Sequence, residues 1–336
     1  MKSYKDVLSA ITGKRNHLLL GNGFSIACSG VFSYGSLYEK AVEKGLSENA
    51  MSVFEYFGTN NFEGVMHALE NADWIGKQYS VIAQTSNEIA SDVELIKKTL
   101  IDAIADSHLS FPGDIEKHKY LKAIKFIEPY HNIFTTNYDL LPYWIDMCDE
   151  LLVKYQDGFR TDIDDPDAGY VMFSEHTRDN KGLFYLHGAL HLYQHNGSVR
   201  KHCWERTGKR LIELIKDGLH KKEYPLFVAE GKADKKLQQI NENGYLSYCY
   251  GKLKRVQNNL VVYGSSLGTS DQHIADIISE NQDIKKVYLG IYDDKDSTAM
   301  LQINKTIERM KDRRKIVNEN KPLEIEMYDS KTVEIW

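Results

Sequence analysis

Four short polar segments hold the residues of this 336-residue sequence whose types and spacing could do chemistry. Each follows an apolar run, and in chain order they are GNGFS (21–25), TTNYD (135–139), HG (187–188) and GSSLGTS (264–270). Two glycines separated by one residue let backbone N–H groups approach a pyrophosphate closely, because glycine has no side chain in the way. Each segment alone also fits a structural role: a tight turn, a helix N-cap at Asn137 or Asp139, a strand end, and a glycine-rich turn.

The apolar runs that precede these segments have the length and composition of buried strands. We predict strands at 17–21, 132–137, 182–188, 225–230, 259–266, 285–293 and 323–329. Helical patterns lie between them, at 89–105, 115–127, 232–242, 271–280 and 297–315. Strands that alternate with helices predict an α/β fold, a Rossmann-like and mostly parallel sheet with helices on both faces.

One long interval lacks strand signals. Residues 36–128 are predicted to form a helical insertion, so the nucleotide-binding and catalytic domain would comprise 1–35 and 129–336. The segment 157–169 is acidic and rich in turn residues, which predicts a loop. Ligands of open parallel sheets bind beyond the carboxyl ends of the strands, where the four polar segments would lie.

Taken together and in this order, the segments G-x-G-x-S, T-x-N-x-D, H-G and G-x-S resemble the sirtuin family. The resemblance covers roughly residues 17–271 and is closest to the sirtuin-like NAD-cleaving proteins of bacterial anti-phage defence, which also carry a helical insertion. Two features of sirtuin deacylases are missing. The segment Gly-Ile-Pro-Asp-Phe-Arg is replaced by GVFSYG (30–35), and the four-cysteine zinc module of the acyl-peptide groove is absent. The resemblance therefore implies that water, rather than an acyl-lysine, is the second reactant.

The resemblance implies roles for single residues in cleaving the bond between nicotinamide and ribose. Asn137 would position water or the sugar hydroxyls, Asp139 would contact the nicotinamide amide, and His187 would engage the ribose hydroxyls. An imidazole with its ordinary pKa near 6.5 suits that role. The residues implied in binding NAD⁺ are Gly21, Asn22, Gly23, Ser25, Thr136, Asp139, Gly264, Ser265 and Ser266. His191 and Asp157 are minor candidates, for which a structural histidine and a solvated loop are the alternatives.

The expected function is an NAD⁺ glycohydrolase that releases nicotinamide and ADP-ribose as an anti-phage effector. Three alternatives stay open: an NAD-dependent deacylase or ADP-ribosyltransferase, a sensor that binds NAD⁺ or ADP-ribose without cleaving it, and a dehydrogenase. The third glycine of the dinucleotide fingerprint is replaced by Ile26, which speaks against a dehydrogenase.

The composition of the sequence limits which binding partners and cofactors are expected. A net charge of −6 gives no general basic field that would bind nucleic acid. The sequence has no run of eighteen apolar residues, so no membrane-spanning helix is expected. The N-terminus lacks the features of a signal peptide, which predicts a cytoplasmic protein. Four scattered cysteines without paired spacing predict neither disulfides nor zinc, and no metal cofactor is expected.

An NADase must be restrained at rest, and the chain offers no second module for this purpose. We therefore expect control by assembly, as a homo-oligomer or with a separate partner. The resemblance adds a hexameric ATPase encoded nearby as a partner. The insertion is the expected contact surface, with Phe62, Val65, Met66 and Leu69 at helical spacing, although these residues could equally pack within their own domain.

Overall fold

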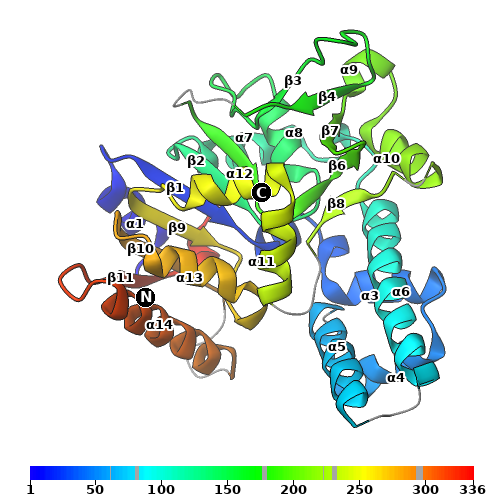
Figure 1. The fold of residues 1–336 in the computed structure, drawn as a ribbon. Coiled ribbons are helices and arrows are strands. Elements are labelled where there is room, and N and C mark those ends of the chain that lie inside the picture. Colours follow the sequence, from blue (N-terminus) through cyan, green and yellow to red (C-terminus); the bar gives the residue numbers. More distant parts are fainter. Residues whose placement is uncertain (61, 80–82, 176–179, 222, 229–232, 293–297) are drawn as a thin grey trace.

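A six-stranded parallel sheet forms the centre of the protein in the computed structural model, which describes all residues except 61, 80–82, 176–179, 222, 229–232 and 293–297 (Figure 1). Its strands, in spatial order, are β11 (Glu324–Asp329), β10 (Ile284–Ile291), β9 (Asn258–Tyr263), β1 (Asn16–Leu20), β2 (Asn132–Thr135) and β5 (Gly182–Tyr185). Every neighbouring pair is parallel. The predicted α/β fold is thus confirmed, because these six strands cover six of the seven predicted runs.

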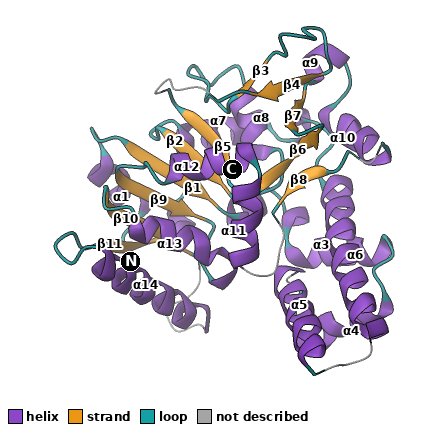
Figure 2. Ribbon diagram, viewed as in Figure 1, coloured by secondary structure: helices purple, strands orange, loops and turns teal. Residues whose placement is uncertain are grey.

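Helices cover both faces of this sheet (Figure 2). On one face, the Phe126 ring of α7 (Lys117–Ile127) lies 5.3 Å from the ring of Tyr263 in β9. On the other face, the Tyr248 ring of α12 (Gly244–Leu253) lies 6.0 Å from that of Phe184 in β5. The remaining helices around the sheet are α1 (Tyr4–Ile11), α2 (Asn22–Cys28), α8 (Leu141–Met147), α11 (Ala233–Glu242), α13 (Gln272–Glu280) and α14 (Thr298–Val317).

The order of the strands is that of dinucleotide-binding folds. Starting from β1, the chain adds β2 and β5 on one side, and then returns to add β9, β10 and β11 on the other side. Numbered by appearance in this sheet, the order is three-two-one-four-five-six, the order of the Rossmann fold. The direction reverses between β1 and β9, so a ligand crevice is expected at their carboxyl ends.

A second sheet, which the sequence did not predict, is antiparallel. Its spatial order is β3 (Phe159–Arg160), β4 (Tyr170–Phe173), β7 (Ser198–His202), β6 (Gly188–His195) and β8 (Pro225–Phe227). The predicted strand at 225–230 belongs here as β8, and its residues 229 and 230 lie outside the described chain. Two short helices, α9 (Trp204–Thr207) and α10 (Leu211–His220), follow β7.

Four helices between β1 and β2 form a bundle that stands beside the sheet in Figure 1. They are α3 (Tyr34–Glu43), α4 (Glu48–Phe57), α5 (Phe62–Gln78) and α6 (Ala83–Ser107). No described residue between 36 and 128 is in a strand. Within that interval α7 belongs spatially to the sheet, where its Phe126 packs, and the bundle itself ends with α6. No helix among the described residues is long and apolar enough to cross a lipid bilayer.

Candidate functional site

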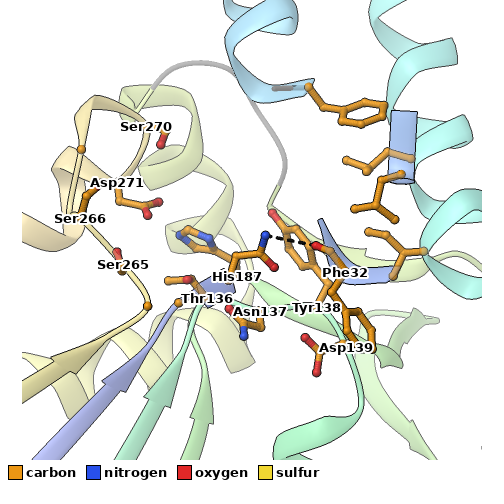
Figure 3. A pocket seen from close by; sticks show the side chains of 18 residues that line it. Phe32, Thr136, Asn137, Tyr138, Asp139, His187, Ser265, Ser266, Ser270 and Asp271 are labelled. Carbon is orange, nitrogen blue, oxygen red and sulfur yellow. Dashed lines mark hydrogen bonds between the residues drawn. The ribbon is translucent and has the colours of Figure 1, made fainter. Parts of the chain in front are cut away.

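A cavity of about 290 Å³ opens at the carboxyl edge of the parallel sheet, next to the reversal between β1 and β9 (Figure 3). The strand ends form one wall, and helices of the bundle form the other. Nine of the predicted site residues line it: Gly21, Asn22, Thr136, Asn137, Asp139, His187, Gly264, Ser265 and Ser266. Gly23 and Ser25 lie beside the cavity without lining it.

The two glycines after β1 let this turn pack against the turn that follows β9. Gly23 N–H donates to the Gly264 carbonyl oxygen at 2.9 Å, and Gly21 N–H donates to the Tyr263 carbonyl oxygen at 2.9 Å. A Cβ atom on Gly21 would lie 2.5 Å from Cβ of Ser265, and one on Gly23 would lie 2.6 Å from Cα of Gly264. The protein's own packing therefore requires both glycines. Contact between these glycines and a pyrophosphate stays a prediction. These two N–H groups already donate hydrogen bonds within the protein, so they are not free to bind it.

Ser25 connects two of the predicted site residues from beneath the cavity. Its buried hydroxyl donates to Oδ2 of Asp139 at 2.5 Å and accepts from Nδ2 of Asn137 at 2.7 Å. The backbone N–H of Asn137 also donates to Oγ1 of Thr135, at 3.0 Å. Ser25 thus positions both side chains, and Oδ1 of Asn137 is buried with no hydrogen-bond partner among the described residues. An unpaired buried oxygen in a cavity wall is available to accept from a water molecule or a sugar hydroxyl.

Asp139 is buried, and this burial raises the pKa of its carboxyl group to about 6. Hydrogen bonds from the Ser25 hydroxyl and the Leu141 N–H favour the charged form and limit this rise. With a pKa of about 6, the carboxyl group is mostly ionised at pH 7, which places a negative charge in the cavity wall.

His187 lies in a polar cluster with the buried residues His273 and Lys236 and the half-buried Asp271. Its Nε2 lies 2.9 Å from Nε2 of His273, so one of the two rings donates a hydrogen bond to the other. Burial lowers the pKa of His187 well below 6.5, and the neighbouring Lys236 and His273 lower it further. The ordinary imidazole pKa assumed from the sequence is therefore wrong, because the sequence gives no measure of burial. His187 is neutral at pH 7 and acts as a hydrogen-bonding group.

His187, Asp271 and His273 offer three ligand atoms within 4.8 Å of one another, which is the spacing of a metal site. However, the fully buried ammonium group of Lys236 lies 3.7 Å from Oδ1 of Asp271. A cation already stands beside the only carboxylate of the group. This charge disfavours a divalent metal there.

Three further polar residues of the wall are held by hydrogen bonds. Nδ2 of Asn22 donates to the Phe32 carbonyl oxygen at 3.3 Å, which is the dashed line in Figure 3. Thr136 N–H donates to the Leu20 carbonyl oxygen at 3.0 Å, and Oγ of Ser265 accepts from Leu267 N–H at 3.1 Å. These bonds fix the wall before a ligand arrives.

The opposite wall is apolar. It consists of Phe32 from the segment after α2, Leu37 from α3, Phe62 from α5, and Leu100 and Ile104 from α6. The insertion therefore encloses the site. Phe62, Val65 and Met66 are fully buried and Leu69 is nearly so, which places these predicted contact residues within their own chain.

Several site residues were missed from the sequence. Asp271 and His273 follow the same strand as the GSS segment, where the sequence predicts only the start of the helix 271–280. Lys236 comes from α11 and gave no signal in the sequence. The minor candidates lie elsewhere: His191 is buried between the rings of Tyr143 and Tyr185. Asp157 forms an ion pair with Lys201.

Among known families, one model matches nearly the whole chain. A search of the curated proteins finds no match to the chain. The matched region includes all four polar segments, the insertion and both sheets. The chain belongs to the family described as a domain of unknown function, DUF4917, whose model matches residues 18–336.

Proposed function

We propose that this protein is an NAD⁺ glycohydrolase, which hydrolyses NAD⁺ to nicotinamide and ADP-ribose. The observation that carries the proposal is the position of Asn137 and His187. Both line one cavity at the strand-order reversal of a sheet with the dinucleotide-binding order. The order of polar segments that resembles the sirtuins supports the same substrate.

The size of the cavity suggests which part of NAD⁺ would lie inside it and which part outside. A volume of about 290 Å³ is at the small end of the range for ligand sites and is too small for a whole dinucleotide. We assign the nicotinamide and its ribose to the enclosed part, near Asn137 and His187. The adenosine half would extend over the rim formed by Gly264, Ser265 and Ser266.

The charges in the wall suit this reaction. Cleavage of the bond between nicotinamide and ribose builds positive charge on the sugar, and the departing nicotinamide is neutral. A carboxylate at Asp139 would stabilise that charge, whereas a protonated His187 would oppose it. The lowered pKa of His187 keeps this imidazole neutral. Oδ1 of Asn137 would accept a hydrogen bond from the attacking water.

Incubation of the purified protein with NAD⁺ alone tests the proposal, with nicotinamide release followed over time. Steady release without any acylated peptide is the expected result. Release only after an acyl-peptide or another acceptor is added would establish the deacylase or transferase alternative. Binding of NAD⁺ without release would establish a sensor, and reduction to NADH with a co-substrate would establish a dehydrogenase.

The biological setting belongs to the same proposal: a cytoplasmic anti-phage effector that is controlled by assembly as a homo-oligomer or by an ATPase partner. The insertion exposes the rings of Tyr56, Phe57 and Trp74. This apolar surface is suited to contact with another copy of the chain or with a partner protein. Light scattering over a tenfold dilution tests this part. A monomer at every concentration that is fully active without a partner would refute it.

A further inference from the structure

A second cavity, of about 360 Å³, lies on a different part of the molecule and shares no lining residue with the first. It is enclosed by the segment before α7, by α7 and α8, and by the chain around α9 and α10. Five aromatic residues dominate its wall: Phe111, Tyr120, Tyr143, Trp144 and Trp204. We call it the aromatic pocket.

The aromatic pocket has a buried floor and an open rim. Trp144 and Tyr143 are buried, whereas Phe111 is 39% exposed and Trp204 is 44% exposed. Large aromatic side chains left in contact with water around an apolar cavity of this size are typical of ligand sites. Flat walls of this kind favour a flat occupant, which stacks on the rings.

One cation completes the rim. The guanidinium group of Arg210 lies 4.8 Å from the centre of the Phe111 ring. No ion pair found among the described residues includes Arg210. The carboxylate of Glu213 accepts from the Arg210 backbone N–H at 3.0 Å. A guanidinium group that lies on an aromatic face, and that is in no ion pair among the described residues, is suited to bind a carboxylate, sulfonate or phosphate group. We propose that the aromatic pocket binds a small planar aromatic molecule that carries one anionic group.

Buried contacts connect this pocket to the candidate site. The Trp144 ring packs edge-on against His108 at 4.9 Å, and His108 packs against Phe32 at 5.3 Å. Phe32 lines the first cavity. Nε2 of His108 accepts from the Leu140 N–H at 2.9 Å, and Leu140 directly follows Asp139. Burial lowers the pKa of His108 to about 4, so the ring stays neutral and keeps this acceptor.

A ligand that moves Trp144 would therefore act on both Phe32 and the Asp139 segment. We assign the aromatic pocket as an effector site. This regulatory role rests on the proposed function of the first cavity, whereas ligand binding does not.

Binding is tested with two fluorescent probes, 8-anilinonaphthalene-1-sulfonate and the uncharged N-phenyl-1-naphthylamine. We expect saturable binding of one molecule of either probe. Trp204→Ala should weaken both probes about tenfold, because it removes one wall. Arg210→Gln should weaken only the sulfonate, also about tenfold. Trp74→Ala is the matched control, since this tryptophan is 61% exposed on the insertion, and it should leave both affinities unchanged.

The outcomes separate the pocket from nonspecific adsorption. Binding that does not saturate, or that Trp74→Ala reduces as much as Trp204→Ala does, would refute the pocket. An equal effect of Arg210→Gln on both probes would refute the anionic part of the assignment.

Coupling is tested by hydrogen exchange of the Leu140 amide with and without the sulfonate probe, together with nicotinamide release. We expect the probe to change this exchange at least threefold, and His108→Gln to abolish the change while the probe still binds. Unchanged exchange in the bound wild type would refute the effector role. A change in exchange in a protein that never releases nicotinamide would retain the coupling and refute the proposed function.

Discussion

The two walls of the candidate site differ in origin and in chemistry. The polar wall consists of turns at the ends of β1, β2, β5 and β9, which the hydrogen bonds of one sheet hold in register. The apolar wall consists of Phe32 and of side chains from a helical bundle that contributes no strand to that sheet. The proposed reacting groups are therefore fixed by the sheet, whereas enclosure of the candidate site depends on how the bundle packs.

This difference predicts separable effects. Changes in the polar wall should alter the rate of the chemical step, or the stability of the turns that form it. Changes in the apolar wall should alter affinity at little cost to turnover, because apolar contacts hold the substrate and its transition state about equally.

The largest effect is expected for Asn137→Ala and His187→Ala. Each should lower the turnover of NAD⁺ about 10²–10⁴-fold, the range for loss of a positioned catalytic group. Nicotinamide release at saturating NAD⁺ is the measurement. His202→Ala is the control, because His202 is also buried but stacks on Tyr193 in the second sheet. Near-normal turnover in either site variant, with an unchanged melting temperature, would contradict the assignment of the site.

The turn after β9 should be a sensitive backbone position of the polar wall. Gly264 has φ +74°, and an added Cβ would lie 2.6 Å from the Phe24 nitrogen. Gly13 has the same φ of +74° with nothing within 4 Å of its Cβ position. Gly13→Ala should cost about 1–2 kcal/mol of the free energy of unfolding, from backbone strain alone. Gly264→Ala should cost about 2–5 kcal/mol, because the clash adds to that strain.

Urea unfolding of the two glycine variants provides this comparison. Equal losses would mean that the turns after β1 and β9 can separate freely. The polar wall would then not be preformed.

The parallel sheet could be predicted because its strands are buried on both faces and appear as continuous apolar runs. The antiparallel sheet was missed because four of its five strands are short, with two to five residues, and because its strands mix polar and apolar residues, as in SVRKH of β7. One signal was overlooked. Asn196 and Gly197 join β6 to β7, with φ of 48° and 78°, and Asn-Gly is the typical pair for such a two-residue hairpin turn.

The site could be predicted in outline because the carboxyl ends of parallel strands meet at one edge. Its electrostatics could not. The pKa of His187 is low first because the group is buried, and in smaller part because Lys236 and His273 approach it. That approach depends on how α11 and α13 pack. Likewise, nothing local to Ser25 indicates that it lies between Asn137 and Asp139, which are more than 110 residues away in the sequence.

A matched pair of buried carboxyl groups tests the charge of the polar wall. Burial raises the pKa of both Asp139 and Asp146 to about 6, above the value near 3.9 of an unfolded chain. Such a group favours the folded state below pH 4, and this contribution is lost as the pH rises through about 6. Asp139→Asn and Asp146→Asn should each reduce this loss, by on the order of 2 kcal/mol.

Unfolding free energies between pH 4 and 7 measure that effect, and turnover separates the pair. Only Asp139 lines the cavity, so only Asp139→Asn should lower turnover, by about tenfold. Equal turnover in the two variants would remove Asp139 from the reacting wall.

The smallest effect belongs to the apolar wall, and α6 supplies both a test position and a control. Ile104 lines the cavity, whereas Ile96 lies two turns earlier on α6, is fully buried and does not line it. Each Ile→Val change removes one buried methylene group and should cost about 0.5–1.5 kcal/mol of the free energy of unfolding. If a substrate ring lies against the bundle, Ile104→Val should also raise KM about fourfold, the equivalent of ~0.8 kcal/mol for one methylene contact. Turnover at saturating NAD⁺ should not change in either variant. A lower turnover in Ile104→Val with KM unchanged would show that the bundle takes part in the chemical step, and the division of labour between the two walls would not hold.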